Sequence, residues 1–136
     1  MKKIFAALFS ITVLGGCAST RRDVLGTEYS QAQTRNYQSR AFDTGDRQTV
    51  LRGIVSAMQD LGFIIDKADA ALGTISGTSF ANNSKLTVSV RSVGKKQTLV
   101  RANAQADLKE ITDPVAYQNF FDSLSQSLFL DANMAE

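Results

Sequence analysis

Two neighbouring stretches of the sequence alternate between polar and apolar residues, and this pattern constrains the fold more than any other feature. Successive side chains of a β-strand point to opposite faces of a sheet, so the alternation predicts strands over Lys85–Val93 and Gln97–Leu108. The buried face is expected to hold Leu86, Val88, Val90, Val100, Ala102, Ala104, Ala106 and Leu108. The polar face is expected to hold Thr87, Ser89, Arg91, Leu99, Arg101, Asn103 and Gln105.

The alternation also predicts how the two strands pair. Odd positions must lie opposite odd positions if each face is to keep its character, so the connecting loop needs an odd number of residues. A loop of Gly94-Lys95-Lys96 pairs Val93 with Gln97 and Arg91 with Leu99. A two-residue turn would pair Arg91 with Thr98 and mix the faces, so we expect the three-residue loop.

An apolar stripe at helical spacing precedes these strands. Between Val50 and Leu61 the apolar residues recur on one face of a helix. Thr44 or Asp46 can accept hydrogen bonds from the first backbone N–H groups, and Gly62 suits the left-handed conformation that ends many helices. We therefore expect an amphipathic helix that ends at about Leu61.

A second apolar stripe begins after Asp113-Pro114, an N-cap residue followed by a proline at the first helical position. This helix is expected to reach about Leu130. Its residues Phe120, Phe121 and Phe129 are predicted to be buried, because the alanines of the last strand leave room for aromatic rings to approach the sheet.

Three weaker strand candidates complete the fold, at residues 41–43, 63–67 and 73–80. Amphipathic helices must cover the apolar face of a one-faced antiparallel sheet. The predicted class is therefore α+β: a two-layer sandwich with an antiparallel sheet of four to five strands and two helices on one face.

The N-terminus reads as a targeting segment. Lys2 and Lys3 are followed by an apolar stretch that ends in Leu14-Gly15-Gly16-Cys17. This arrangement resembles the bacterial lipoprotein signal peptide, whose lipobox has a leucine, two small residues and a cysteine. The resemblance implies that the chain is cleaved before Cys17 and that Cys17 carries covalent lipid.

Two or more acyl chains anchor a protein stably to a membrane. Ala18 stands where the inner-membrane retention signal of this family has aspartate, which implies the outer membrane, with the domain in the periplasm. The expected organisation is a signal peptide over 1–16, the lipidated cysteine and a flexible tether over 17–39, one domain over 40–131 and a tail over 132–136. The alternative for Arg21, Arg22, Arg35 and Arg40 is contact with lipid phosphates or a partner.

Composition excludes several classes of active site. The chain has no histidine and one cysteine, so it can form neither a His-dependent catalytic set, nor a His-ligated metal site, nor an internal disulfide. The close acidic pairs, Asp66 with Asp69 and Glu110 with Asp113, fall at strand ends and turns, where carboxylates usually cap the backbone. We expect no enzymatic activity, no metal and no cofactor besides the lipid on Cys17.

The charge distribution is uneven. The precursor has a formal net charge of +2, and loss of Lys2 and Lys3 brings it to zero, so net charge gives no support to nucleic-acid binding. Between Asp69 and Asp107, however, the sequence has no acidic residue. The basic residues of this stretch form the candidate binding face: Lys85, Arg91, Lys95, Lys96 and Arg101.

The order of elements resembles the helix-grip domains of the BamC lipoproteins, which are accessory subunits of the outer-membrane β-barrel assembly machinery. Val50–Gly77 and Tyr117–Leu130 carry most of the likeness. Together with Arg40–Thr44, these stretches are also similar to small uncharacterised bacterial lipoproteins. BamC proteins have two such domains, whereas this chain has one, and the family offers no catalytic residue to transfer.

These features predict a non-enzymatic, membrane-anchored lipoprotein that binds another envelope protein as an accessory or scaffold subunit. The alternative is an envelope module that binds lipid, lipopolysaccharide or peptidoglycan through the basic hairpin. A ligand held between helices and sheet would require a cavity there, and the small residues of the last strand favour close packing instead.

Overall fold

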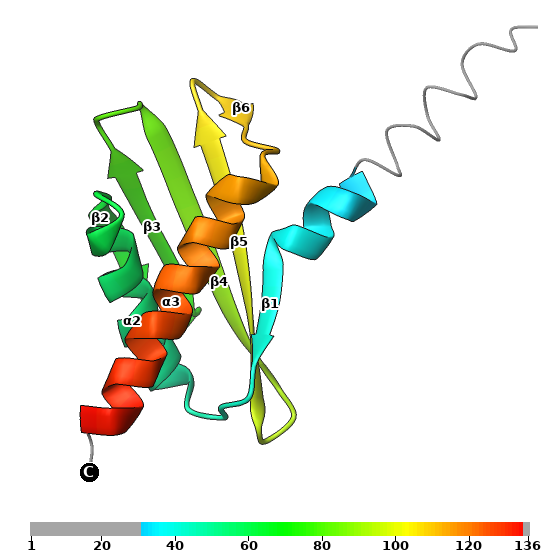
Figure 1. Ribbon diagram of the computed structural model, residues 1–136, viewed down its shortest axis with the longest axis vertical. Coiled ribbons are helices and arrows are strands. Elements are labelled where there is room, and N and C mark those ends of the chain that lie inside the picture. The colour runs from blue at the N-terminus through cyan, green and yellow to red at the C-terminus, as the bar shows by residue number, and fades with distance from the viewer. Residues whose placement is uncertain (1–30, 135–136) are drawn as a thin grey trace, which may run out of the picture.

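The computed structural model describes residues 31–134 of the chain (Figure 1). Residues 31–37 are helical. The elements that follow are β1 (Ser39–Phe42), α2 (Arg47–Asp60), β2 (Ile64–Asp69), β3 (Thr74–Ser79), β4 (Ser84–Val93), β5 (Gln97–Ala106), β6 (Lys109–Glu110) and α3 (Pro114–Met134).

All strands belong to one antiparallel sheet with the order β1-β5-β4-β3-β2, and β6 pairs with the far end of β5. The α+β class is therefore confirmed. The sheet has six strands rather than four to five, because a short hairpin after β5 adds β6.

The predicted pairing of β4 with β5 is confirmed. Val93 lies opposite Gln97 and Arg91 lies opposite Leu99, so the loop contains three residues. Gly94 adopts a φ of 65°, a conformation that glycine reaches without steric cost. The register keeps one apolar and one polar face along the whole hairpin.

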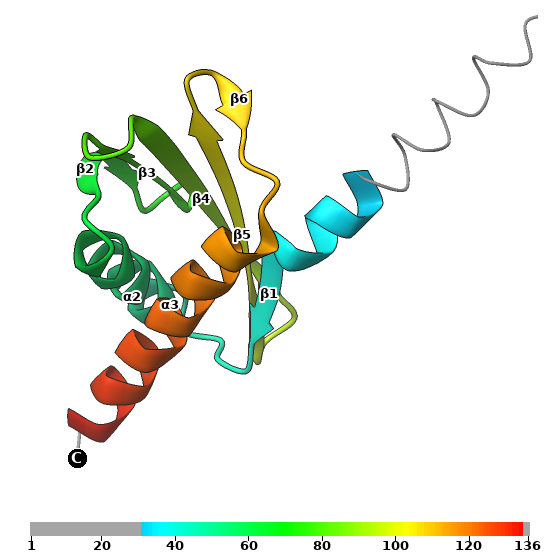
Figure 2. The same cartoon turned by 45° about the horizontal axis from the view of Figure 1, so that its top comes forward.

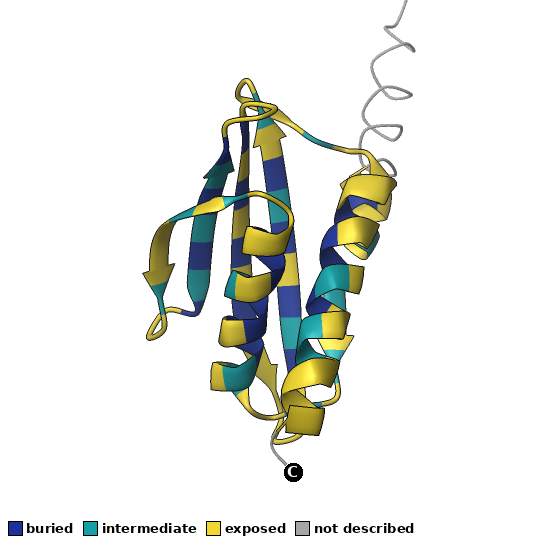
Figure 3. Ribbon diagram, turned by 60° about the vertical axis from the view of Figure 1, so that its left-hand side comes forward, coloured by how far each residue is buried: buried dark blue, intermediate teal, exposed yellow. Residues whose placement is uncertain are grey.

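Helices α2 and α3 lie side by side on the apolar face of the sheet (Figures 1 and 3). Their buried side chains and those of the sheet form one cluster. The cluster contains Val50, Leu51, Ile54, Ala57 and Met58 of α2, Ile75, Leu86, Val88, Val90, Val100, Ala102 and Ala104 of the sheet, and Tyr117, Phe120, Phe121 and Leu124 of α3.

Asp46 is the N-cap of α2. Its Oδ1 accepts hydrogen bonds from the backbone N–H groups of Gln48 (3.0 Å) and Thr49 (3.2 Å), and its Oδ2 accepts one from the Thr49 hydroxyl (2.7 Å). These bonds, led by the one from the Thr49 side chain, hold the pKa of the Asp46 carboxyl below its ordinary value. Gly62 follows the helix with a φ of 81°, as a C-terminal stop requires.

The second strand of the hairpin ends earlier than its alternation predicts. β5 stops at Ala106, and Asp107 and Leu108 turn the chain with φ values of 48° and 67°. Leu108, expected in the core, is 96% exposed. The alternation continues by two residues past the point where the backbone leaves the sheet.

The last helix is longer than predicted and reaches Met134, so the expected tail from residue 132 is helical up to that residue. Phe129 was predicted to be buried, which is wrong, since 67% of it is exposed. α3 has 21 residues and α2 has 14, and the C-terminal turns of α3 project beyond α2 (Figure 2). The projection does not explain Phe129, however, because the preceding residue Leu128 still packs against Gly53 in the middle of α2. Phe129 lies alongside α2 but outside the stripe of α3 that packs.

The folded domain begins earlier than residue 40. The predicted tether over 17–39 is wrong for its last residues, because Thr34 and Gln38 are buried and Tyr37 is half-buried. The Tyr37 ring lies 5.9 Å from that of Tyr117, and its hydroxyl donates to the carbonyl oxygen of Thr112 at 2.9 Å. Long-range contacts of this kind give no signal in a polar sequence.

The predicted signal peptide, the lipobox residues Leu14, Gly15 and Gly16, and Cys17 lie outside the described residues. Within residues 31–134, no helix is long and apolar enough to cross a membrane.

Candidate binding face

The outer face of the β4–β5 hairpin carries the residues that the alternation assigned to it. Thr87, Ser89, Arg91, Arg101 and Gln105 are exposed. Leu99 and Asn103 are half-buried. Helices α2 and α3 do not cover this face, because both pack against the opposite one (Figure 3), while Thr34 and Arg35 of the helical stretch 31–37 line a hollow beside Arg101.

The structure brings two of the predicted arginines together. Arg101 lies opposite Ser89, and Arg91 is two residues further along β4, so the two arginines are diagonal neighbours. Residues in this relation have Cα atoms about 7–8 Å apart and side chains on the same face. Their guanidinium groups can therefore reach one ligand surface.

Lys95 and Lys96 continue this positive charge in the loop that joins the strands. Lys85 does not belong to the same group. It lies six residues before Arg91 on β4, which corresponds to about 20 Å along a strand. Arg101 lies between these extremes, four residues from Gln97 at the start of β5 and four from Gln105, the partner of Lys85. We call Arg91, Lys95, Lys96 and Arg101 the basic end, because Arg91 links Arg101 to the loop.

The cations of the basic end have no ion-pair partner within residues 31–134, where the ion pair present joins Arg40 to Asp122 at 3.4 Å. The acidic residue placed near the loop is Asp43, whose carboxylate accepts a hydrogen bond from Gln97 at 2.8 Å. Glu110 lines the same hollow as Arg101 and accepts hydrogen bonds from Gln38 and Asn103. Four cations without an ion-pair partner, spread from the loop to the middle of a rigid hairpin, create a positive field that attracts anionic surfaces.

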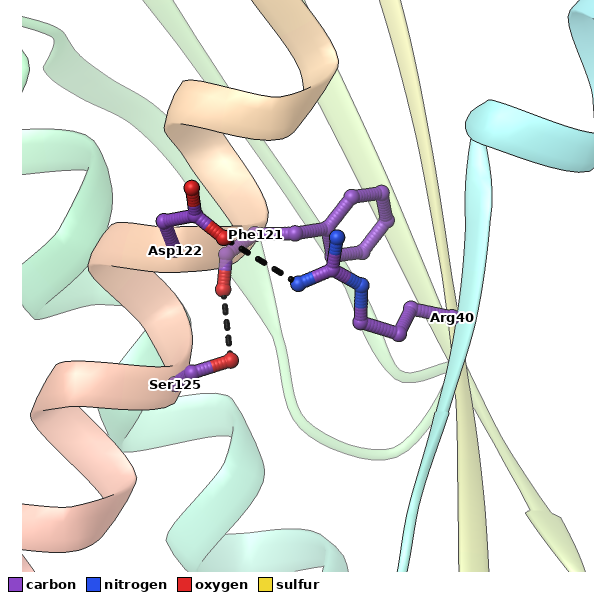
Figure 4. A network of polar contacts seen from close by, with 4 residues as sticks. All are labelled: Arg40, Phe121, Asp122 and Ser125. Atoms are coloured by element: carbon purple, nitrogen blue, oxygen red, sulfur yellow. Dashed lines mark hydrogen bonds and ion pairs between the residues drawn. The ribbon is translucent and has the colours of Figure 1, made fainter.

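Arg40, a candidate for partner contact in the sequence, has an internal role. Its guanidinium carbon lies 4.9 Å from the centre of the Phe121 ring, and Nη1 contacts Asp122 (Figure 4). Ser125 donates to the backbone carbonyl of Phe121 at 2.7 Å in the same region. Arg40 therefore ties β1 to α3 and is not part of the basic end.

An apolar groove beside the basic end gave no signal in the sequence analysis. It has a volume of about 530 Å³ and is lined by Thr44, Thr49, Arg52, Leu128, Asp131, Ala132 and Met134. The loop before α2 connects it to the hairpin, since Gly45 lies directly against the carbonyl oxygen of Lys95, where a Cβ would clash. The sequence hints at this groove only through the two apolar stripes at helical spacing, because the stripe of α3 is longer than that of α2.

The space between helices and sheet is filled by side chains. Val88, Val100 and Ala102 on the sheet expose no surface, and Phe121 opposite them exposes 1%. A water-sized space against these residues would give them exposed area, so the interior at this point is closed. A ligand site between α3 and the last strand, one of the sequence alternatives, finds no support in this geometry.

Two of the four acidic residues, Asp69 and Asp113, cap the backbone as expected, whereas Asp66 and Glu110 accept hydrogen bonds from side chains distant in sequence. Asp66 accepts from the Thr78 hydroxyl (2.7 Å), Asp69 from the backbone N–H of Leu72 (2.9 Å), and Asp113 from that of Val115 (3.0 Å). Glu110 accepts from the side chains of Gln38 and Asn103. Within residues 31–134 no group of three or more acidic, histidine or cysteine side chains is arranged to hold a metal ion.

Comparison with known proteins adds no relative. No model of a protein family matches the chain, and no curated protein matches it.

Proposed function

We propose that this chain is a lipid-anchored accessory subunit of a cell-envelope complex, and that its basic end binds an acidic surface of another envelope protein. The observation that carries the proposal is the group formed by Arg91, Lys95, Lys96 and Arg101. These residues are exposed and have no ion-pair partner within residues 31–134. Charges arranged in this way steer association and set partner choice.

The rigidity of the hairpin supports binding of a protein surface. β4 and β5 pair over ten residues each, so the basic end is held in one geometry before a partner arrives. Little conformational entropy is then lost on binding. The adjacent groove between α3 and the loop before α2 extends the same end with apolar surface.

The proposed location follows from Leu14-Gly15-Gly16-Cys17 and Ala18, which resemble the lipobox and sorting position of outer-membrane lipoproteins. The BamC-like order of elements agrees with an accessory role. In this proposal the protein has no catalytic residue and binds no metal or nucleic acid. The lipid on Cys17 is a covalent modification that anchors it.

Charge reversal tests the proposal. Arg91→Glu combined with Arg101→Glu should lower co-purification of the partner by about tenfold or more, because two favourable contacts become repulsive. The matched control, Lys67→Glu with Lys85→Glu, changes the net charge equally at exposed sites outside the basic end. Equal recovery of the partner with wild type and R91E/R101E would contradict the proposal.

The alternative ligand is lipopolysaccharide or peptidoglycan, since their phosphates and carboxylates would meet the same unpaired cations. It predicts that the purified lipoprotein binds these molecules without any other protein, and that added salt weakens the binding. Binding of that kind, lost in R91E/R101E and kept in K67E/K85E, would favour the alternative over a protein partner.

A further inference from the structure

The opposite end of the domain has a different chemistry. The turn between β3 and β4 exposes 77% of Phe80, and the turn between β5 and β6 exposes 96% of Leu108. Ser79, Ser84 and Ala106 lie in one row across β3, β4 and β5, so both turns lie at the same end of these strands. A hydrogen bond from Asn83 to Asp107 joins them. We call Phe80 and Leu108 the apolar tip.

The apolar tip contributes nothing visible to folding. Leu108 also holds a left-handed backbone conformation, which is unfavourable for a branched side chain. Asn83 and Asp107, the neighbouring residues with positive φ, are of the types that tolerate it. A strained and exposed leucine beside an exposed phenylalanine indicates a surface that acts outside the domain.

The start of the described chain lies toward the same end. Gln31 shares a shallow hollow with Glu110, which follows Leu108 by two residues, and with Arg101 in the middle of β5. Figures 1 and 2 show residues 31–37 on the β6 side of the sheet. Residues 18–30 separate this point from Cys17 and span at most about 45 Å when extended.

That length favours one orientation on a membrane. β4 runs from the edge that bears the apolar tip to the basic end, about 30 Å for ten residues. If the basic end lay on the lipid, residues 18–30 would have to run from residue 31 back along the domain. That path would use most of the about 45 Å that these residues can span. The apolar tip lies nearer than the loop of the basic end to residue 31, where the described chain begins, so an anchor on Cys17 raises its local concentration at the lipid surface.

We infer that the apolar tip inserts into the interfacial region of the membrane that holds the lipid anchor, so that the basic end faces away from it. Phe80 and Leu108 enter the boundary between headgroups and acyl chains, at the depth of about 5–10 Å that peripheral segments reach. Lys109, exposed directly after Leu108, lies at the level of lipid phosphates. This inference rests on the lipid anchor of the proposed function.

The test uses the full mature lipoprotein in vesicles of phosphatidylethanolamine and phosphatidylglycerol, with and without brominated acyl chains. Because lipid occupies Cys17, a cysteine introduced as Ala81→Cys takes a single fluorescent label next to the tip. Lys96→Cys places the same label in the loop of the basic end. Both positions are exposed turn residues.

Brominated lipid should quench the label at residue 81 at least about twofold more than the label at residue 96. Adding Phe80→Ser and Leu108→Asn should abolish this difference while the protein stays in the vesicle fraction. Asparagine tolerates the left-handed backbone at 108, and both native side chains are exposed, so the variant keeps the fold. Thermal unfolding of each variant checks this.

Equal quenching at both positions, or stronger quenching at residue 96, would overturn the inference, as would quenching at 81 that survives F80S/L108N. A blue-shifted label at 81 without bromine quenching would assign the tip to a protein surface or a second copy. Mass analysis of Cys17 separates the two proposals: an unlipidated chain overturns both, whereas a lipidated chain with no quenching at 81 overturns only the docking.

Discussion

The two faces of the β4–β5 hairpin have the same backbone and opposite environments. On the inner face Val88, Val100 and Ala102 expose no surface. On the outer face Arg91 and Arg101 are exposed and have no ion-pair partner within residues 31–134. The comparison teaches that the apolar half of the hairpin holds the fold together, which leaves the polar half available for recognition.

The largest loss of stability is expected in the core, where α3 packs against the inner face of the hairpin. Phe121→Ala should lower the free energy of unfolding by about 3–5 kcal/mol, because it removes a buried ring and leaves a cavity. Phe129→Ala, in the same helix but largely exposed, is the matched control and should cost less than about 1 kcal/mol. Urea unfolding measures both, and equal losses would contradict the assigned core.

A substitution of Tyr117, which is also buried in α3, tests the hydrogen bonds inside the core. Its hydroxyl donates to the carbonyl of Ile111 (2.6 Å) and accepts from the backbone N–H of Ala104 and the side chain of Gln38 (3.2 Å each). Tyr117→Phe leaves buried polar groups unpaired and should cost about 1–3 kcal/mol of unfolding free energy. A variant as stable as wild type in urea would show that these bonds contribute nothing.

The cap of α2 is exposed but hydrogen-bonded, so an intermediate effect is expected. Asp46→Ala should lower the Tm by about 4 °C near neutral pH. Because the folded pKa of Asp46 is lowered, its stabilisation is complete above the unfolded value of about 3.8 and is lost as the pH falls through the folded value.

The gap in Tm between wild type and D46A should therefore close in acid. Asp46→Asn is the control, because asparagine caps helices about as well and does not titrate. Its Tm should stay close to that of wild type near neutral pH. A gap between wild type and D46A that stays constant down to pH 2 would argue against the lowered pKa.

The smallest effect on stability is expected on the outer face. R91E/R101E should change the free energy of unfolding by no more than about 0.5 kcal/mol, since both residues are exposed and unpaired. Denaturation of the purified variant measures this value. A loss of 2 kcal/mol or more would mean that the outer face takes part in folding, and the division between the two faces would fail.

Much of the hairpin could be predicted because a period of two fixes both faces and the register at once. The alternation gave the pairing of Arg91 with Leu99 correctly. It failed at Leu108, because the pattern reports the face of a strand and not the point where the backbone turns away. The extra strand β6 follows from that turn and has only two residues.

Helical spacing likewise found α2 and α3 but not what each residue meets. Leu128 packs against Gly53 of α2, whereas the next residue, Phe129, falls outside the contact, and the line along which two helices meet is not encoded locally. Gln38 and Tyr37 lie in a polar stretch, and their burial depends on contacts with residues more than 70 positions away.

The candidate site was predictable as a list of residue types and not as a group. The gap between acidic residues identified Lys85, Arg91, Lys95, Lys96 and Arg101. Only the strand register shows that Arg91 and Arg101 are neighbours and that Lys85 is at the other end of β4. The apolar tip depends on two turns brought to one edge by the sheet, which no local pattern contains.

The most direct test of the central claim is native sizing and mass spectrometry of the lipoprotein after extraction in mild detergent. The account predicts a lipidated Cys17 and a stoichiometric complex with another envelope protein, from which R91E/R101E dissociates while K67E/K85E does not. A lipoprotein that runs alone at the mass of its monomer or dimer, in wild type and variants alike, would contradict it.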